Sequence, residues 1–160
     1  MKKLNYLVAA LLFSGVLLMG CGGSSGGEKT SEEDLQIERL AKSWGLSGTS
    51  TVFRDSDNIT ADYSGFRITL NSSFTYSITG DANEIFASTS GSWDFPRNSS
   101  GDASNLGQIL IDGDTRPITV VVDTEGTVLD ISFVISNGTP IGGRVAGLDG
   151  DYIFSDLVPQ

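Results

Sequence analysis

Apolar and polar residues alternate with a period of two over most of the chain from residue 44 onward. This is the pattern of strands that bury one face. Clusters of Gly, Asn, Asp and Ser interrupt the alternation at short intervals, as turns do. The pattern predicts eight strands, at Trp44 to Phe53, Phe66 to Asn71, Phe74 to Thr79, Gly91 to Phe95, around Ile109 and Ile111, Ile118 to Val122, Leu129 to Ile135, and around Tyr152 and Phe154. It also predicts longer polar loops at 54–64, 97–107 and 137–150.

One short helix is predicted ahead of these strands, from about Glu32 to Lys42. Ser31 is a good N-cap with Asp34 three residues later, and acidic residues in a first turn suit the helix dipole. The expected inward face consists of Leu35, Leu40 and Ala41. A helix this short is not stable alone in water, so we expect it to pack against the strands.

The predicted strands favour an all-β fold, an eight-stranded antiparallel up-and-down barrel with a short N-terminal helix. Most connections are short, and residues 71–73 suffice for a hairpin, so consecutive strands should lie side by side. Closure into a barrel also removes exposed strand edges. A two-sheet β-sandwich is the alternative. Residues 34–160 are predicted to form this single domain.

The start of the chain has a different pattern. Met1-Lys2-Lys3 is basic, and an apolar run from Leu7 to Leu18 follows. The run is shorter than the roughly 20 residues of a membrane-spanning helix, and its build is typical of a secretory signal peptide over residues 1–20. The residues Leu18-Met19-Gly20-Cys21 resemble the lipobox of bacterial lipoproteins. This resemblance implies cleavage before Cys21 and acylation of Cys21; a soluble secreted protein with a free thiol is the alternative.

Residues 21–33 are predicted to tether the domain to a membrane. Residues 22–27 are all Gly or Ser, and a flexible linker of about 10 to 12 mobile residues has an r.m.s. reach of roughly 16 to 20 Å. The chain is therefore expected to be lipid-anchored to the bacterial outer membrane. The acidic residues Glu32, Glu33 and Asp34 resemble a signal for export to the cell surface, but they lie well beyond Cys21. The periplasmic face and the cell surface thus both remain open.

Charge and composition narrow the function. Without residues 1–20, 8 basic and 20 acidic residues remain, and the formal charge is −12. Nucleic-acid binding is not expected, because phosphate contacts need a basic surface. The chain has no His and only one Cys, so Ser/His/Asp and Cys/His catalysis and the usual zinc sites are not expected either. No cofactor and no enzymatic activity are predicted, and the oligomeric state is not predicted.

Several Asp-rich turns have residue types that bind calcium. They lie at residues 55–58, 112–114 and 149–151. An EF-hand loop needs Asp or Asn at its fifth position, where these segments have Ile59, Arg116 and Ile153. Turn formation is therefore the preferred interpretation, and no metal site is predicted.

A set of short motifs resembles a known group of proteins. The motifs are Trp44-Gly45-Leu46, Phe74-Thr75-Tyr76-Ser77, Ser90-Gly91-Ser92-Trp93-Asp94-Phe95, Leu129-Asp130-Ile131-Ser132-Phe133 and Tyr152-Ile153-Phe154. In this order, over about residues 40–157, they are similar to the small lipocalin-like lipoproteins of Bacteroidetes-type bacteria. True lipocalins have Gly two positions before the first Trp, where this chain has Lys42. The resemblance implies a lipocalin-like barrel and binding of a small apolar molecule or a glycan.

The interior of such a barrel is either filled by side chains or holds one small ligand. The predicted inward aromatic residues are Phe66, Phe74, Tyr76, Trp93, Phe95, Phe133, Tyr152 and Phe154. Their bulk favours a filled core, with any ligand at a barrel mouth formed by the long loops. The candidate ligand-binding residues are Trp44, Tyr76, Trp93, Arg144 and Tyr152. Arg144 has a second interpretation as a structural arginine that closes the barrel end.

Two functional hypotheses follow. The first is a membrane-anchored, non-catalytic cell-envelope lipoprotein that binds a small apolar molecule or a glycan; it predicts a pocket with polar groups. The second is a structural or interaction subunit of an envelope or surface complex. It predicts a filled barrel with an exposed apolar or aromatic patch.

Overall fold

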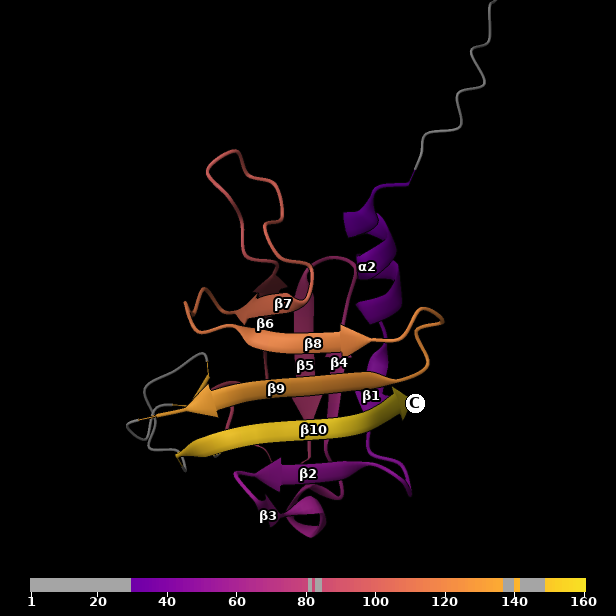
Figure 1. The fold of residues 1–160 in the computed structure, drawn as a ribbon, viewed down its shortest axis with the longest axis vertical. Coiled ribbons are helices and arrows are strands. Elements are labelled where there is room, and N and C mark those ends of the chain that lie inside the picture. Colours follow the sequence, from indigo (N-terminus) through magenta and orange to yellow (C-terminus); the bar gives the residue numbers. More distant parts are fainter. Residues whose placement is uncertain (1–29, 81, 83–84, 137–139, 142–148) are drawn as a thin grey trace, which may run out of the picture.

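The computed structural model describes residues 30–80, 82, 85–136, 140–141 and 149–160. These residues form a closed, eight-stranded antiparallel β-barrel (Figure 1). Its strands, in spatial order, are β1 (Ser43–Gly45), β4 (Arg67–Leu70), β5 (Thr75–Thr79), β6 (Ser90–Asp94), β7 (Gln108–Ile111), β8 (Ile118–Val122), β9 (Leu129–Ile135) and β10 (Gly150–Pro159). Pairing of β1 with β10 closes the ring. The predicted all-β barrel with sequential strand neighbours is confirmed.

The predicted first strand, Trp44 to Phe53, is wrong in one respect, because it is two strands. β1 lies in the ring, whereas β2 (Thr51–Arg54) pairs with β10 outside it. A turn separates them, in which the backbone N–H of Ser47 donates to Oγ of Ser50 at 2.8 Å. The predicted polar loop 54–64 then adds the short β3 (Asp57–Asn58) and the 3-10 helix η1 (Thr60–Tyr63).

Strand β10 pairs with both β2 and β1 because it changes direction at a bulge. Its first part pairs with β2 and its last residues pair with β1. Between them, Asp156 has a φ of 57°, and the register against β9 shifts. The Asp156 N–H donates to Oδ1 of Asp130 at 2.8 Å, and Ser50 Oγ donates to the Asp156 carbonyl at 2.6 Å. These bonds hold the bulge that lets one strand close the barrel.

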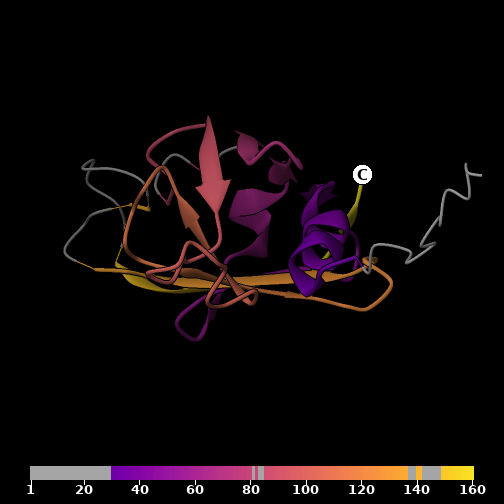
Figure 2. The same cartoon turned by 90° about the horizontal axis from the view of Figure 1, so that it is seen from above.

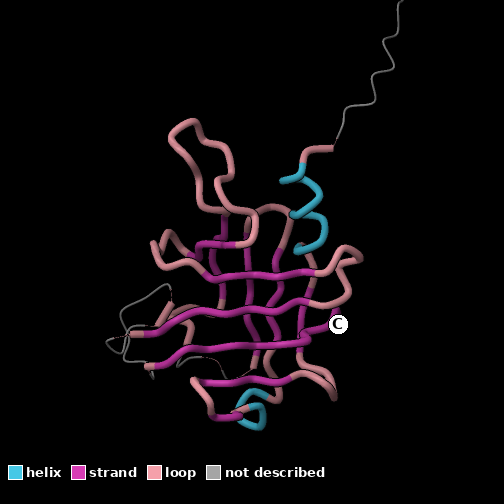
Figure 3. The backbone as a smooth tube through the Cα atoms, viewed as in Figure 1, coloured by secondary structure: helices cyan, strands magenta, loops and turns pink. Residues whose placement is uncertain are grey.

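The barrel is flattened into two layers whose strands run across one another (Figure 1). β8, β9, β10 and β2 form one layer, while β1, β4 and β5 belong to the other (Figures 1 and 3). Figure 2 shows the first layer edge-on, with the helix α2 and the other layer on the same side of it. Because hydrogen bonds join the layers at β6–β7 and β1–β10, the fold is a barrel and not the alternative sandwich.

One continuous apolar core fills the space between the layers. Of the predicted inward aromatic residues, seven are buried and Phe74 is half-buried. Phe74 has a φ of 59° because it ends the turn that opens at Asn71, and β5 therefore begins at Thr75. Some buried residues lie outside the predicted strands, namely Tyr63, Ile85, Phe86 and Ile141.

The helix α2 (Glu32–Leu40) starts as predicted and ends earlier than Lys42. Ser31 and Asp34 form a capping box, in which the Asp34 N–H donates to Ser31 Oγ at 3.0 Å. Leu40 is fully buried and Ile37 packs on the core, while Leu35 and Ala41 are only half-buried. No helix among the described residues is long and apolar enough to cross a membrane.

Candidate functional site

Four predicted ligand-binding residues lie in the core. Trp44, Tyr76, Trp93 and Tyr152 are each at most 3% exposed. Their polar atoms have partners within the fold: Trp44 Nε1 donates to the Leu40 carbonyl at 2.9 Å, and Trp93 Nε1 donates to the carbonyl of Asn71 at 3.1 Å. A ligand that used these side chains would have to displace core packing, and a ligand role for them stays a prediction.

The remaining predicted site residues lie outside the described part of the chain. They are Leu18, Met19, Gly20 and Cys21 of the lipobox, and Arg144.

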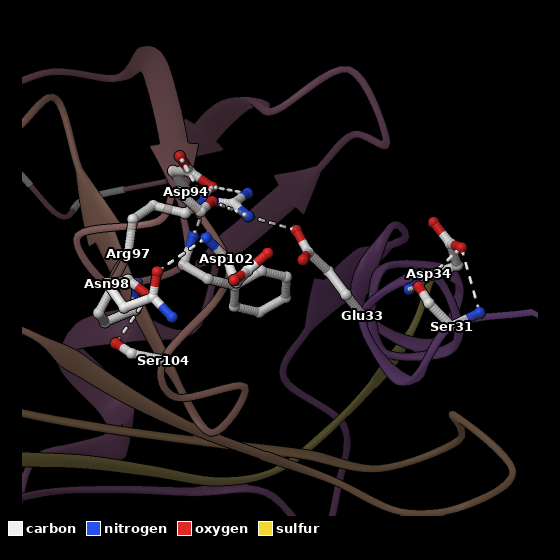
Figure 4. Close-up of polar contacts among 11 residues, drawn as sticks. Ser31, Glu33, Asp34, Asp94, Arg97, Asn98, Asp102 and Ser104 are labelled. Atoms are coloured by element: carbon white, nitrogen blue, oxygen red, sulfur yellow. Dashed lines mark hydrogen bonds and ion pairs between the residues drawn. The ribbon is translucent and has the colours of Figure 1, made fainter.

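Within the described residues, a different arginine, Arg97, connects the helix α2 with one end of the barrel (Figure 4). Arg97 follows β6, and its guanidinium forms salt bridges of 2.6 Å to Asp94 and 2.7 Å to Glu33 of α2. It also lies 5.9 Å from the centre of the Phe74 ring. Hydrogen bonds to Asp94, and then to Glu33, raise the pKa of Arg97 above its ordinary value. Arg97 therefore links the helix to the barrel end, the structural role considered for Arg144.

The loop that follows Arg97 is held by its own side chains. Oδ1 of Asn98 accepts from the backbone N–H groups of Ser100 and Asp102, and Ser104 Oγ donates to the Pro96 carbonyl. Beside this loop lies a hollow of about 520 Å³. Its lining includes Phe74, Ser92, Asp94, Phe95, Arg97 and Leu110. Trp93, one of the predicted ligand-binding residues, also lines it. The hollow thus places the half-buried Phe74 ring next to the Asp94 carboxylate, which is half exposed.

The outer face of the layer β8–β9–β10 carries exposed apolar residues. Val121 is 60% exposed, Val134 55% and Ile153 41%. Ser132 lies between them, since it pairs with Ile153 on one side and with Thr119 on the other. We call these five residues, one or two from each of three adjacent strands, the outer-face patch. None of these five side chains is charged.

A second hollow, of about 550 Å³, lies over one end of the outer-face patch. Thr119, Ser132, Val134 and Ile153 line it, with Arg116 and Asp151 at its sides. Arg116 forms a 2.6 Å salt bridge to Asp114 and donates to the Pro140 carbonyl. The hydrogen bonds to Asp114 raise the pKa of Arg116. Arg116 is thus already engaged within the fold, and the hollow offers mainly apolar and hydroxyl groups.

Two of the Asp-rich turns use carboxylates for hydrogen bonds to distant parts of the chain. Oδ1 of Asp55 accepts from the Asp151 N–H at 2.9 Å, and Asp112 accepts from Tyr76 and Ser92. In the described part of the chain, no three residues of the types His, Cys, Asp and Glu are placed to hold a metal ion.

Three short apolar runs in the sequence indicate the outer-face patch, but they were interpreted above only as parts of strands with one buried face. Each exposed residue is the middle one of three apolar residues, in Val120-Val121-Val122, Phe133-Val134-Ile135 and Tyr152-Ile153-Phe154. In a strand with one buried face, the middle residue of such a run must point outward. Three runs on neighbouring strands therefore indicate an apolar outer surface.

Comparison with protein-family models, with curated proteins and with solved structures finds no match to this chain. The function is therefore argued from the geometry described above.

Proposed function

We propose that the chain is a lipid-anchored protein of a bacterial cell envelope and that it acts as a non-catalytic interaction module. Acylated Cys21 holds it to the outer membrane, and the outer-face patch binds a protein partner. The observation that carries the proposal is that Val121, Val134 and Ile153 are 41–60% exposed on one outer face of three adjacent strands, with the hydroxyl residues Thr119 and Ser132 between them. Large apolar residues exposed together on one face of a folded domain mark interaction surfaces.

Packing of the barrel supports an interaction module over a carrier with an internal ligand. The described interior is a continuous core in which aromatic rings pack against one another. The ring centres of Phe66 and Phe154 lie 4.6 Å apart, and those of Phe133 and Tyr152 lie 5.5 Å apart. Protein interiors packed in this way have little room for a guest molecule. Recognition by this domain is therefore assigned to its outside.

The anchor is tested by labelling cells that express the full chain with an alkyne analogue of palmitate. We expect label on the wild-type chain and none on Cys21→Ser, which should also leave the membrane fraction. Label that persists on Cys21→Ser would contradict acylation at this residue. Protease treatment of intact cells then separates the two possible faces, because only a surface-exposed domain is digested.

The interaction surface is tested by placing a photo-crosslinking amino acid at Ile153 in the host envelope. The control position is Thr79, which is exposed on the other layer. We expect a discrete adduct from position 153 and none from position 79. Equal adducts from both positions, or none from position 153, would contradict a role for the outer-face patch.

The hollow beside Arg97 favours a second candidate function, binding of a small glycan. The half-buried ring of Phe74 offers an apolar surface, and the exposed carboxylate of Asp94 accepts hydroxyl hydrogen bonds. A thermal-shift screen of the mature chain against oligosaccharides and lipids tests it. Stabilisation by one sugar, lost in Asp94→Ala, would support this function, and no shift with any compound would count against it.

A further inference from the structure

The outer-face patch has acidic neighbours on its own strands. Asp130 pairs with Val121 across β8 and β9, and Asp151 pairs with Val134 across β9 and β10. Asp156 lies at the β10 bulge, where its N–H donates to Asp130. Asp130 and Asp151 therefore lie directly beside Val121 and Val134 on the outer face, and Asp156 lies next to Asp130.

None of these three carboxylates forms a salt bridge with another described residue. Two arginines on neighbouring segments, Arg116 and Arg54, have partners of their own. Arg116 pairs with Asp114, while Arg54 hydrogen-bonds Tyr152, which raises the pKa of Arg54, and has Asp57 and Asp55 close by. The border of the patch therefore has a negative charge that the fold itself does not offset.

This negative charge disfavours several classes of binding partner for the outer-face patch. A second copy of the chain would bring the same acidic border against itself, and each mature chain has a formal charge of −12. Anionic lipid headgroups and nucleic acid would be repelled for the same reason. The surface that fits presents apolar side chains to the three exposed apolar residues and positive charges to the carboxylates beside them.

Resting on the proposed function, we infer that the partner of the outer-face patch is a protein surface that combines exposed apolar side chains with adjacent Lys or Arg. Its apolar side chains cover Val121, Val134 and Ile153, and its cations pair with Asp130, Asp151 and Asp156. Association should then be fast at low ionic strength and weaken as salt is added, because these pairs form at an exposed border.

The test uses the mature chain with Cys21→Ser, labelled with ¹⁵N, and three short amphipathic helical peptides. The peptides share one pattern of leucines and carry lysine, glutamine or glutamate at the polar positions. Amide shifts report where each peptide binds. We expect the leucine–lysine peptide to perturb residues of the outer-face patch and the leucine–glutamate peptide to leave them unchanged.

Two variants with the same change of net charge sharpen the test. Asp130→Asn, Asp151→Asn and Asp156→Asn together remove the border charge and keep the oxygen that accepts the bulge hydrogen bond. We expect about a tenfold loss of affinity for the lysine peptide, since three rim pairs are removed. The matched control, Glu32→Gln, Glu38→Gln and Asp62→Asn, lies on other exposed segments and should change affinity by less than about twofold.

The outcomes separate the two proposals. Equal binding of the lysine and glutamine peptides to the patch would overturn the cationic partner and leave the docking surface standing. An equal loss of affinity in both triple variants would also overturn it. Binding away from the patch, or no binding by any peptide, would overturn the docking surface itself.

Discussion

The phenol of Tyr76 on β5 donates a 2.7 Å hydrogen bond to Oδ2 of Asp112, which directly follows β7. Oδ1 of the same carboxylate accepts from the Ser92 N–H on β6 at 2.8 Å. One side chain thus joins three neighbouring strands where the barrel turns from one layer into the other. Gly91 makes room for it, because an added Cβ there would overlap with the Asp112 carboxylate.

Gly91→Ala should therefore destabilise the barrel. The new methyl group displaces the Asp112 carboxylate and leaves the Tyr76 hydroxyl without its main acceptor. We expect a loss of about 2 to 3 kcal/mol in the free energy of unfolding, measured by urea denaturation. Gly48→Ala is the control, because an added Cβ at Gly48 meets nothing within 4 Å. Equal stability of both variants would contradict the arrangement around Asp112.

The Tyr76 hydroxyl should also make the free energy of unfolding decrease at alkaline pH. Burial, and then the bond to Asp112, raises the pKa of Tyr76 above its ordinary value. The folded chain therefore holds this proton more tightly than the unfolded chain. The stabilisation is complete below the unfolded pKa of about 10 and is lost as pH rises through the folded pKa. We expect Tyr76→Phe to be less stable at neutral pH and to lose less stability above pH 10 than the wild type; parallel curves would refute this.

Two adjacent residues of β10 should differ sharply in their effect on stability. Phe154 is fully buried against Phe66 and Tyr63, whereas Ile153 is 41% exposed. Phe154→Ala should cost about 3 to 5 kcal/mol because it leaves a cavity. Ile153→Ala should change the free energy of unfolding by at most about 1 kcal/mol. Chemical denaturation measures both, and a large loss for Ile153→Ala would show that the outer face is buried in the purified chain.

The contact between Arg97 and Glu33 should couple α2 weakly to the barrel. Both side chains are about 30% exposed, so solvent screens the pair. We expect a coupling of about 0.5 kcal/mol in a double-mutant cycle of Arg97→Ala and Glu33→Ala. Arg97→Ala alone should lower the free energy of unfolding by about 1 kcal/mol, because it also removes the contacts of Arg97 with Asp94 and with the Phe74 ring. A coupling near zero would mean that Arg97 holds only its own loop.

The alternation of residues was sufficient to predict the barrel. Strands such as β4 and β9 bury every second residue, so their period is visible in the sequence. Short turns make consecutive strands, such as β4 and β5, neighbours in the barrel. Capping residues likewise predicted the start of α2 at Ser31. These features depend on local chemistry, which one sequence records directly.

Other features depend on long-range contacts. The division of the first predicted strand follows from β10, which pairs with β2 before its bulge at Asp156 and with β1 after it, on the edge opposite β9. The residues Ser47-Gly48-Thr49-Ser50 are a local turn signal, but they do not record that the two strands pair with different partners. The aromatic residues proposed for ligand binding, Trp44 and Trp93 among them, are chemically suited to either role, and only the three-dimensional packing shows that they are core.

The proposed use of the outer-face patch is tested most directly by thiol protection, because the chain has only one cysteine and the account places an acyl group on it. Ile153→Cys and, as a control, Thr79→Cys are treated with a maleimide in intact envelopes and again after detergent extraction. We predict that Cys at position 153 is protected in the envelope and labelled after extraction, while position 79 is labelled in both. Equal labelling of position 153 under the two conditions would contradict a bound partner on this face.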